Sequence, residues 1–366
     1  MSLKAGIVGL PNVGKSTLFN AITKKNILAA NYPFATIDPN VGVVTVPDSR
    51  LEVLENMYQP ERTIPTTFEF TDIAGLVKGA SHGDGLGNKF LSHIREVDAI
   101  VEVVRCFEDR DITHVEGTVD PIRDIEIINV ELILADLEII EGRIEKIAKK
   151  AEATKDKVAL LEVEALKKAK NSLQNNTPLR LVNFDKEEAL ILKNFNFLTI
   201  KPLIYAANVN ENDAIIGKNE YTDLVSKKAE EENARVIIMS AKIESELSEL
   251  SDEDKKNFLK EIGINNSGLD KLIFATYDLL GLQTFLTSGK DEVRAWTFKK
   301  GTRAPQCAGI IHSDFERGFI KAEIMSFNDL EELGSEKAVK EAGKLRLEGK
   351  DYIMQDGDIV YFRFNV

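Results

Sequence analysis

The sequence has few of the residues that build disulfides and metal sites, with two cysteines and four histidines among 366 residues. Cys106 and Cys307 lie far apart, and Cys106 follows an apolar, strand-like run, so we expect buried thiols in a reducing compartment and no disulfide. The scattered histidines argue against a structural zinc ion. No apolar run reaches the roughly 18 residues of a membrane helix, and a strand begins almost at the N-terminus, which leaves no room for a signal peptide. We therefore expect a cytoplasmic chain without a membrane partner.

Positive charge is also outweighed by negative charge, since 47 Lys and Arg stand against 60 Asp and Glu, which gives a net charge of −13. Such a charge disfavours nucleic acid as a partner, but it is unevenly distributed. Residues 282–366 carry 13 Lys and Arg against 14 Asp and Glu, and residues 129–199 carry 12 against 12. The acidic excess falls mostly in the rest of the chain, so an RNA-containing partner is not excluded. The length predicts two or three domains.

What the chain does have is a glycine-rich loop between a strand and a helix near its start. An apolar run at 5–8 indicates a buried strand, Gly9-Leu-Pro-Asn-Val-Gly-Lys-Ser16 follows, and residues 17–22 look helical. This is the G-x-x-x-x-G-K-[ST] pattern in the context that gives it meaning. Its backbone N–H groups and the helix dipole favour phosphate, Lys15 adds a positive charge, and Ser16 offers a hydroxyl to Mg²⁺. The pattern predicts a nucleotide site formed by Asn12, Val13, Gly14, Lys15, Ser16 and Thr17.

A second motif, Asp72-Ile-Ala-Gly75, ends the strand-like run at 66–71. An aspartate there can hold Mg²⁺ through water, and the N–H of Gly75 can sense the γ-phosphate. In the proline-bounded loop 31–40, Thr36 is positioned to complete the Mg²⁺ shell, and Thr45 is the competing choice. We therefore expect Ser16, Thr36 and Asp72 to hold the metal.

Apolar strand-like runs alternate with helical stretches along much of the chain, at 41–46, 66–71, 99–104, 201–207 and 235–239. This alternation predicts an α/β fold with a doubly wound, mostly parallel sheet.

A long helical stretch interrupts this alternation. A heptad seam is formed by Ile133, Leu137, Ile140, Ile144 and Ile147. The seam could continue through the charged segment 149–157 as one long helix, but the sheet must resume near residue 201, which favours an antiparallel two-helix insertion. We expect its charged tip to be a solvated turn.

The last part of the chain changes character. Residues 282–298, 317–327 and 352–364 look strand-like, with one helical piece at 329–342, and Asp356-Gly357 predicts a turn. A small mixed α+β module fits this pattern.

The loop expected to contact the base departs from the N-K-x-D pattern of guanine-binding proteins. Asn208-Val-Asn-Glu211 follows the strand 203–207, so Val209 replaces the lysine and the longer Glu211 replaces the aspartate. The extra methylene displaces the carboxylate by more than a hydrogen bond tolerates. The Asn208 amide and the Val209 backbone can supply the donor and acceptor that adenine needs, and Ser240-Ala241-Lys242 matches the remaining base-side loop. The sequence therefore predicts that ATP is preferred over GTP.

Three segments together resemble the Obg-like ATPase (YchF) family of translation-factor-class P-loop proteins: 9–17, 72–80 with 82–90, and 208–211. The resemblance covers essentially the whole chain. It implies a GTPase-like P-loop domain at 1–130 and 200–281, a helical coiled-coil insertion at 131–199 and a β-grasp domain similar to the TGS domain at 282–366. It also implies hydrolysis of ATP, often of GTP as well, and association with the ribosome or its RNA.

Hydrolysis needs a group that positions water, and the glutamine that follows DxxG in Ras-type enzymes is replaced by Leu76. The candidates are His82, His93 and His114. A histidine at the place of His114 is a proposed catalytic group in the resembling family, so we expect His114 and Lys15 to assist hydrolysis. Asn12 resembles the asparagine that ligates K⁺ in some relatives, and a hydrogen bond that braces the loop is its alternative role.

Two other functions remain open at this point. One is a conventional GTPase. The other is a binding module in which the nucleotide is only a conformational signal, which Leu76 favours because slow chemistry suits a switch; the helical insertion and the β-grasp module would then face the partner. We expect a monomer.

Overall fold

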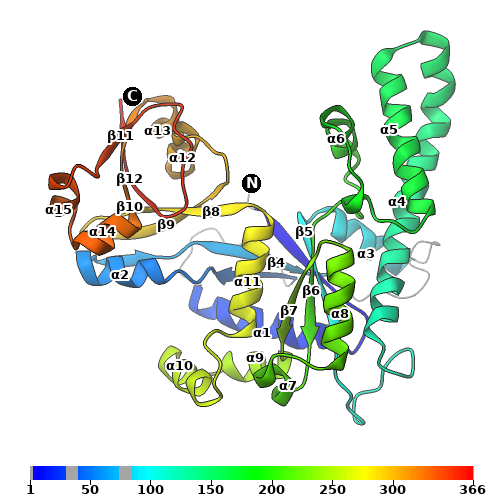
Figure 1. The fold of residues 1–366 in the computed structure, drawn as a ribbon, viewed down its shortest axis with the longest axis horizontal. Helices are drawn as coiled ribbons and strands as arrows, with labels where there is room; N and C mark the ends of the chain where they lie inside the picture. Colours follow the sequence, from blue (N-terminus) through cyan, green and yellow to red (C-terminus); the bar gives the residue numbers. More distant parts are fainter. Residues whose placement is uncertain (1–2, 30–39, 74–84, 366) are drawn as a thin grey trace. The chain divides into compact units, whose positions relative to one another are not determined.

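The computed structural model describes residues 3–29, 40–73 and 85–365. The chain divides into two compact units, the first formed by Met1–Val44 and Glu69–Thr276, the second by Thr45–Phe68 and Tyr277–Val366. Each main stretch of regular structure can be followed by its colour in Figure 1. Two six-stranded sheets organise the described residues.

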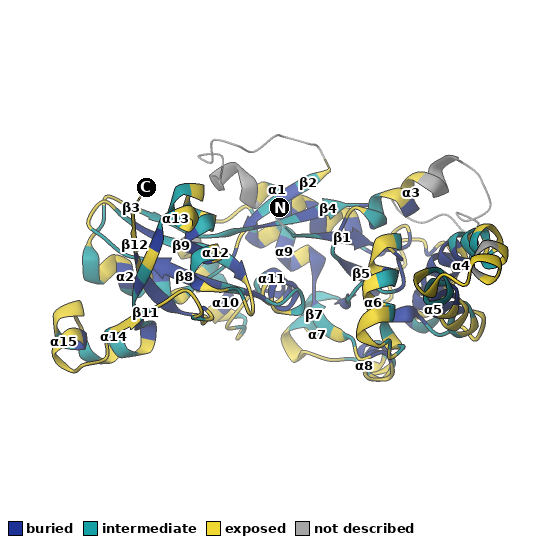
Figure 2. Cartoon of the chain, turned by 90° about the horizontal axis from the view of Figure 1, so that it is seen from above, coloured by how far each residue is buried: buried dark blue, intermediate teal, exposed yellow. Residues whose placement is uncertain are grey.

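The first sheet carries the nucleotide motifs and has the strand order β2-β4-β1-β5-β6-β7. Strands β4, β1, β5, β6 and β7 pair in parallel. Strands β5 and β6 are buried along their whole length, as their largely apolar sequences predict, and β5 can be seen in Figure 2. The expected doubly wound, mostly parallel sheet is confirmed. Its strands are β1 (Lys4–Val8), β2 (Val41–Thr45), β4 (Thr67–Asp72), β5 (Ala99–Arg105), β6 (Leu203–Asn208) and β7 (Arg235–Met239).

Helices connect the strands of this sheet, as parallel pairing requires, and three more helices, α9 to α11, follow its last strand in sequence, β7. They are α1 (Lys15–Ala29), α3 (Gly85–Arg95), α7 (Glu211–Ile216), α8 (Glu220–Glu231), α9 (Ala241–Leu247), α10 (Asp252–Glu261) and α11 (Gly268–Leu279).

An antiparallel pair of helices, α4 (Pro121–Thr154) and α5 (Lys157–Gln174), interrupts the alternation between β5 and β6, and Figure 1 shows the two running side by side. The expected seam packs here, because Ile133 and Ile140 share a buried cluster with Leu166. Asp136 fixes the base of the pair: its carboxylate accepts hydrogen bonds from the backbone N–H groups of Leu198 and Thr199 at 3.0 and 2.8 Å. The antiparallel insertion is confirmed. The return to β6 contains η2 (Leu179–Leu181), α6 (Lys186–Leu192) and η3 (Lys193–Phe195).

The second sheet has the order β11-β10-β12-β8-β9-β3. Strands β8 and β9 form an antiparallel hairpin, and the last strand, β12, lies parallel to β8 and antiparallel to β10. This insertion of the last strand beside the first is the β-grasp arrangement expected for the C-terminal module. The strands are β3 (Arg62–Ile64), β8 (Leu282–Thr287), β9 (Glu292–Lys299), β10 (Phe319–Ser326), β11 (Arg346–Glu348) and β12 (Asp358–Phe364).

The second unit differs from the sequence expectation in its helices. Residues 304–317 form α12 (Ala304–Ile311) and α13 (Ser313–Arg317), which we did not expect. The helix expected at 329–342 is two helices, α14 (Phe327–Leu333) and α15 (Glu336–Glu341), because Gly334 ends the first with φ 75°. Residues 352–357 are not a strand, whereas the turn at Asp356-Gly357 is present, with φ 80° at Gly357.

The second unit also takes a segment from the first part of the chain, which the sequence analysis missed. Helix α2 (Ser49–Tyr58) packs Leu51 and Leu54 into the same buried cluster as Leu286 and Ile359. Strand β3 pairs in parallel with β9 and adds an edge to the sheet. The domain boundaries given above, which no comparison tests, stay a prediction.

Among the described residues, no helix combines the length and the apolar character that crossing a membrane requires.

Candidate functional site

The loop between β1 and α1 folds back tightly over residues 9–14. Asn12 and Gly14 adopt left-handed φ values of 63° and 95°, which a glycine accepts at low cost. A Cβ at Gly14 would lie 2.2 Å from Nδ2 of Asn208, so this position also needs glycine for space. The loop that the pattern predicted to bind phosphate therefore has a compact backbone, which packs closely against Asn208 at the end of β6.

Lys15 and Asp72, the charged residues of the two motifs, are in direct contact. The parallel pairing of β1 with β4 sets Ile7 opposite Asp72 and so brings the end of β4 beside the loop. The ammonium of Lys15 forms an ion pair with Oδ1 of Asp72. Their side chains are 10% and 24% exposed. The motifs at 9–16 and 72–75, separated by about sixty residues of sequence, thus form one site, as parallel strand pairing predicts.

The oxygen atoms offered near this ion pair suit Mg²⁺. Ser16 is exposed in the first turn of α1 and Asp72 ends β4. A hydroxyl and a carboxylate are hard ligands of the kind that Mg²⁺ binds while it keeps several waters. The two remaining residues expected to face the metal and the γ-phosphate, Thr36 and Gly75, lie outside the described residues. Thr45, the alternative to Thr36, is exposed at the end of β2.

Asn208, which ends β6, holds the loop from the base side. Its Nδ2 donates to the carbonyl of Val13 at 2.8 Å, and its Oδ1 accepts from the N–H of Ala241 at 2.9 Å. The side chain is buried, and each amide atom keeps one remaining hydrogen-bonding position. The N–H of Val209 donates to the carbonyl of Met239 at 2.9 Å. Of the Val209 backbone groups expected to serve adenine, the N–H is already used in this bond, which leaves the carbonyl.

Glu211 stands where the aspartate of N-K-x-D would be, and it forms an ion pair with Lys242. The hydrogen bond from Lys242 lowers the pKa of Glu211, and the same contact raises the pKa of Lys242. Ser240 caps the N-terminus of α9. The second base-side loop thus contacts the first in two places, through Ala241 to Asn208 and through Lys242 to Glu211.

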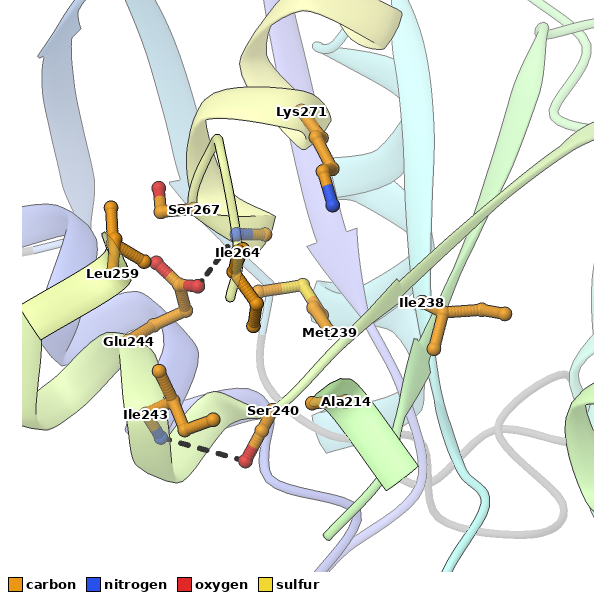
Figure 3. Close-up of a pocket in the computed structure, with 11 residues that line it drawn as sticks. Ala214, Ile238, Met239, Ser240, Ile243, Glu244, Leu259, Ile264, Ser267 and Lys271 are labelled. Atoms are coloured by element: carbon orange, nitrogen blue, oxygen red, sulfur yellow. Dashed lines mark hydrogen bonds between the residues drawn. The ribbon is translucent and has the colours of Figure 1, made fainter. Parts of the chain in front are cut away.

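A small cavity lies beside this loop, between α9 and the start of α11 (Figure 3). Its volume is about 20 Å³, which is room for a water molecule and far too little for a nucleobase. Oε1 of Glu244 accepts from the N–H of Gly268 at 2.7 Å across one wall. We therefore assign this cavity to packing and not to base binding.

A second loop, residues 106–114 after β5, contacts the phosphate loop. Asn12 donates from Nδ2 to the carbonyl of Thr113 at 3.1 Å, which is the bracing contact considered above. Arg105, 1% exposed, organises this second loop by donating to the carbonyls of Phe107 and Ile112 at 3.1 and 3.0 Å. The guanidinium thus satisfies the loop carbonyls from inside, as a buried charge must.

His114 lies in the same loop and is buried, with a side chain that is 2% exposed. Its Nδ1 accepts from the N–H of Glu116 at 3.1 Å, so the proton lies on Nε2, which is 2.8 Å from Oδ2 of Asp124. Neither ring nitrogen is directed at solvent in this arrangement. The geometry gives His114 a bracing role, and a role in orienting water would first require the loop to open.

The other two candidate histidines are not brought to the site by the described structure. His93 lies half-buried on α3. His82 and Leu76 lie outside the described residues.

Sequence reasoning missed two residues of this site, Arg105 and Asp124. An arginine at the end of a mostly apolar buried run, Ala99–Arg105, is a signal that could have indicated a buried loop organiser. Asp124, in the first turn of α4, carried no comparable signal, because acidic residues are common there without any tertiary role.

Comparison with known proteins places the chain among characterised sequences. A profile described as "50S ribosome-binding GTPase" matches residues 4–136, and the profile YchF-GTPase_C, described as "Protein of unknown function (DUF933)", matches residues 282–365. The chain is similar to the Ribosome-binding ATPase YchF of Bacillus subtilis, with 59% identity over 367 residues and 100% of both chains covered. The Obg-like ATPase 1 of Caenorhabditis elegans is 46% identical, over 100% of this chain and 92% of its own length.

A solved structure agrees with the fold. The Schizosaccharomyces pombe YchF GTPase superposes with a TM-score of 0.90 at 43% identity, covering 99% of this chain and 98% of that one.

Proposed function

The chain belongs to the YchF family of Obg-like ATPases, and from this premise we propose that it is a Mg²⁺-dependent nucleotide hydrolase that prefers ATP to GTP and associates with the ribosome. The family relationship makes it a P-loop NTP hydrolase. The name Ribosome-binding ATPase, borne by its bacterial relatives, supports the ribosomal partner. A cytoplasmic location and a monomeric state belong to the same proposal.

The preference for ATP rests on Glu211, whose carboxylate is poorly placed to accept hydrogen bonds from guanine. A guanine-selective site needs a free carboxylate aimed at the two donors of the base edge, whereas this carboxylate is longer by one methylene and already paired. Asn208 keeps one N–H and one acceptor position after bonding to Val13 and Ala241. These two positions, together with the carbonyl of Val209, offer the mixed donor and acceptor set that adenine needs.

Ser16 and Asp72 would hold Mg²⁺, with Thr36 as the third ligand. The metal would supply positive charge to the β- and γ-phosphates, where charge develops during transfer. Lys15 would bind the same phosphates and leave Asp72 to the metal. Asn12, which uses Nδ2 for its bond to Thr113, keeps its amide oxygen for K⁺. Monovalent cation dependence is part of the proposal.

The nucleotide preference is tested by rebuilding the guanine pattern. In the double variant Val209→Lys with Glu211→Asp, the sequence becomes Asn-Lys-Asn-Asp, and the ratio of the Kd values for ATP and GTP should shift toward GTP by at least tenfold. The matched control is Glu211→Met, which also breaks the pair with Lys242 but carries no oxygen to accept from guanine; its ratio should stay near that of the wild type. Tenfold tighter binding of GTP than ATP by the wild type would contradict the proposal and favour a conventional GTPase.

The site of hydrolysis is tested separately with Lys15→Ala. Loss of the ammonium should reduce ATP turnover by at least a hundredfold, because the phosphates lose the buried positive charge of Lys15. Normal turnover in this variant would remove the phosphate loop from the reaction.

A nucleotide-gated switch is compatible with this enzyme activity. Leu76 cannot orient water, and the ring nitrogens of His114 are both occupied, so slow intrinsic turnover is expected. Co-sedimentation with ribosomes in the presence of a non-hydrolysable ATP analogue and of ADP tests this use of the nucleotide. The expected result is stronger association in one of the two states, and equal association in both would argue against a switch.

A further inference from the structure

The turn that joins α4 and α5 is unusually basic for this chain. Residues 146–157, here called the hairpin tip, carry five lysines and two acidic residues, a net charge of +3 in a chain of net charge −13. We propose that the hairpin tip is an RNA-binding surface whose lysines contact the phosphate backbone. The proposal rests on the ribosome association proposed above and names the element that makes the contact. The charged residues are Lys146, Lys149, Lys150, Glu152, Lys155, Asp156 and Lys157.

Four of these lysines are exposed and free of ion pairs. Among the residues that the structure describes, none of the ion pairs involves Lys146, Lys149, Lys155 or Lys157. The shaft of the hairpin behaves differently. There Arg143 pairs with Glu162 at 2.6 Å, and Lys170 pairs with Glu141 at 2.9 Å, so charges on α4 and α5 neutralise each other. These ion pairs between α4 and α5 stop where the tip begins, so the four lysines have no ion-pair partner within the described residues.

The spacing of the lysines on α4 carries an electrostatic cost. Lys146 and Lys149 are three residues apart on α4, and spacings of three or four residues place side chains on one face of a helix. Like charges at these spacings destabilise a helix by roughly 0.2–0.5 kcal/mol per pair. A turn that only needs to be solvated has no use for this repulsion, whereas a bound polyanion removes it. The arrangement therefore favours a contact over the solvated turn that the sequence alone predicted.

The tip is also held in a defined shape. Lys155 adopts a left-handed φ of 51°, and Asp156 caps α5 by accepting from the N–H of Val158 at 2.9 Å. Ile144 and Ile147 pack against the buried cluster between the two helices close to the turn. A preformed basic end loses little conformational entropy on binding. At 1.5 Å per residue, the 34 residues of α4 extend about 50 Å, and Figure 1 shows the tip at the end of the hairpin remote from β5 and β6.

The chemistry of the tip favours phosphate over other acidic partners. Lysine presents a compact point charge that suits phosphate oxygens, and the tip has no aromatic residue to stack on a base. Among the described residues of the tip and its immediate flanks, Val158 is the one large apolar side chain that is exposed, which is too small a surface for a protein partner. We therefore expect sequence-independent, salt-sensitive contact with an RNA backbone.

The test compares two sets of four substitutions in the full-length chain. The tip variant changes Lys146, Lys149, Lys155 and Lys157 to Gln. The matched control changes four other exposed lysines of the first unit to Gln: Lys193, Lys227, Lys256 and Lys260. Both variants lose the same charge, so a difference between them reports position. Circular dichroism verifies that both variants fold, and binding to purified ribosomes and to protein-free ribosomal RNA is measured between 50 and 200 mM salt.

Each phosphate contact adds about −0.7 to −0.9 to the slope of log K against log salt. The wild type and the control should therefore lose about 50- to 150-fold more affinity than the tip variant over this fourfold change in salt. Equal binding and equal slopes for all three proteins on ribosomes would overturn the inference and leave the ribosome association intact. No binding of the wild type to either probe would overturn both. Tip-dependent binding to ribosomes without binding to protein-free RNA would assign the tip to an acidic protein and overturn the RNA contact.

Discussion

The Asn208 side chain bonds to both Val13 and Ala241, an arrangement here called the Asn208 clamp, and its position makes a strong prediction about Gly14. The two residues are 194 positions apart, yet a Cβ on Gly14 would lie 2.2 Å from Nδ2 of Asn208 and 3.3 Å from its Cγ, while its next neighbour, Cβ of Ala241, is at an ordinary 3.5 Å. Gly14→Ala should therefore destabilise the first unit by two effects. A left-handed φ of 95° costs a non-glycine residue about 1–2 kcal/mol. The clash adds about 1–3 kcal/mol.

The two effects are separable in a double-mutant cycle. Asn208→Ala leaves the Val13 carbonyl and the Ala241 N–H without their partner, at about 1–3 kcal/mol each. In that background the clash at Gly14 is gone and only the backbone strain remains. The double variant should thus be about 1–3 kcal/mol more stable than additivity predicts.

Hydrogen exchange gives the most local assay for this cycle. The free energy of opening is measured for peptides that cover residues 9–20 and 203–212, and peptides from β8 and β9 in the second unit serve as the control. Strict additivity would refute the reasoning that Gly14 and Asn208 compete for one space. Unchanged protection of residues 9–20 in Asn208→Ala would refute the clamp itself.

Three further predictions concern buried or bracing groups. His114→Ala should lower the free energy of unfolding by about 1–3 kcal/mol, because Asp124 and the Glu116 N–H lose a buried partner; urea denaturation measures this, and unchanged stability would contradict the bracing role. Asn12→Ala removes the bond to Thr113, worth about 1 kcal/mol, so ATP affinity should fall about three- to tenfold; equal Kd values for both proteins would show that the tether does not shape the loop. Glu102 is buried in β5, and burial raises its pKa well above the usual value, with only partial compensation by Arg180. The folded protein keeps this proton at pH values where the unfolded chain has released it, so the stability of the wild type should fall as pH rises above the usual pKa of glutamate. Glu102→Gln should lose that part of the slope and be more stable at alkaline pH, and a parallel pH dependence in both proteins would contradict this.

The layout of the first unit could be predicted because its signals are local. Short, mostly apolar runs in the sequence correspond to the strands β1, β4, β5, β6 and β7. The heptad seam on α4 packs against α5 in the helical hairpin. The two phosphate-side motifs were found for the same reason. Parallel pairing then brings Lys15 and Asp72 together without further information.

The parts that sequence reasoning missed depend on contacts between distant residues. Nothing in Ser49–Tyr58 indicates that Leu51 and Leu54 pack with Leu286 and Ile359 in the second unit. The Val209 backbone was expected to serve the base, but its N–H already donates to the carbonyl of Met239 at the end of β7. His114 looked like a loop histidine, and its burial against Asp124 follows only from the path of the chain into α4. The last two cases were decided by hydrogen bonds, whose partners are known only from the structure.

The central claim is that this P-loop hydrolase is an ATPase by preference, although its fold is that of GTPases. The most direct test is the ratio of kcat/KM for ATP and GTP, measured side by side with Mg²⁺ and K⁺ present and with Lys15→Ala as the blank. We predict that kcat/KM is higher for ATP than for GTP. In Lys15→Ala, the turnover of both nucleotides should be lost. A kcat/KM for GTP tenfold above that for ATP would contradict the account.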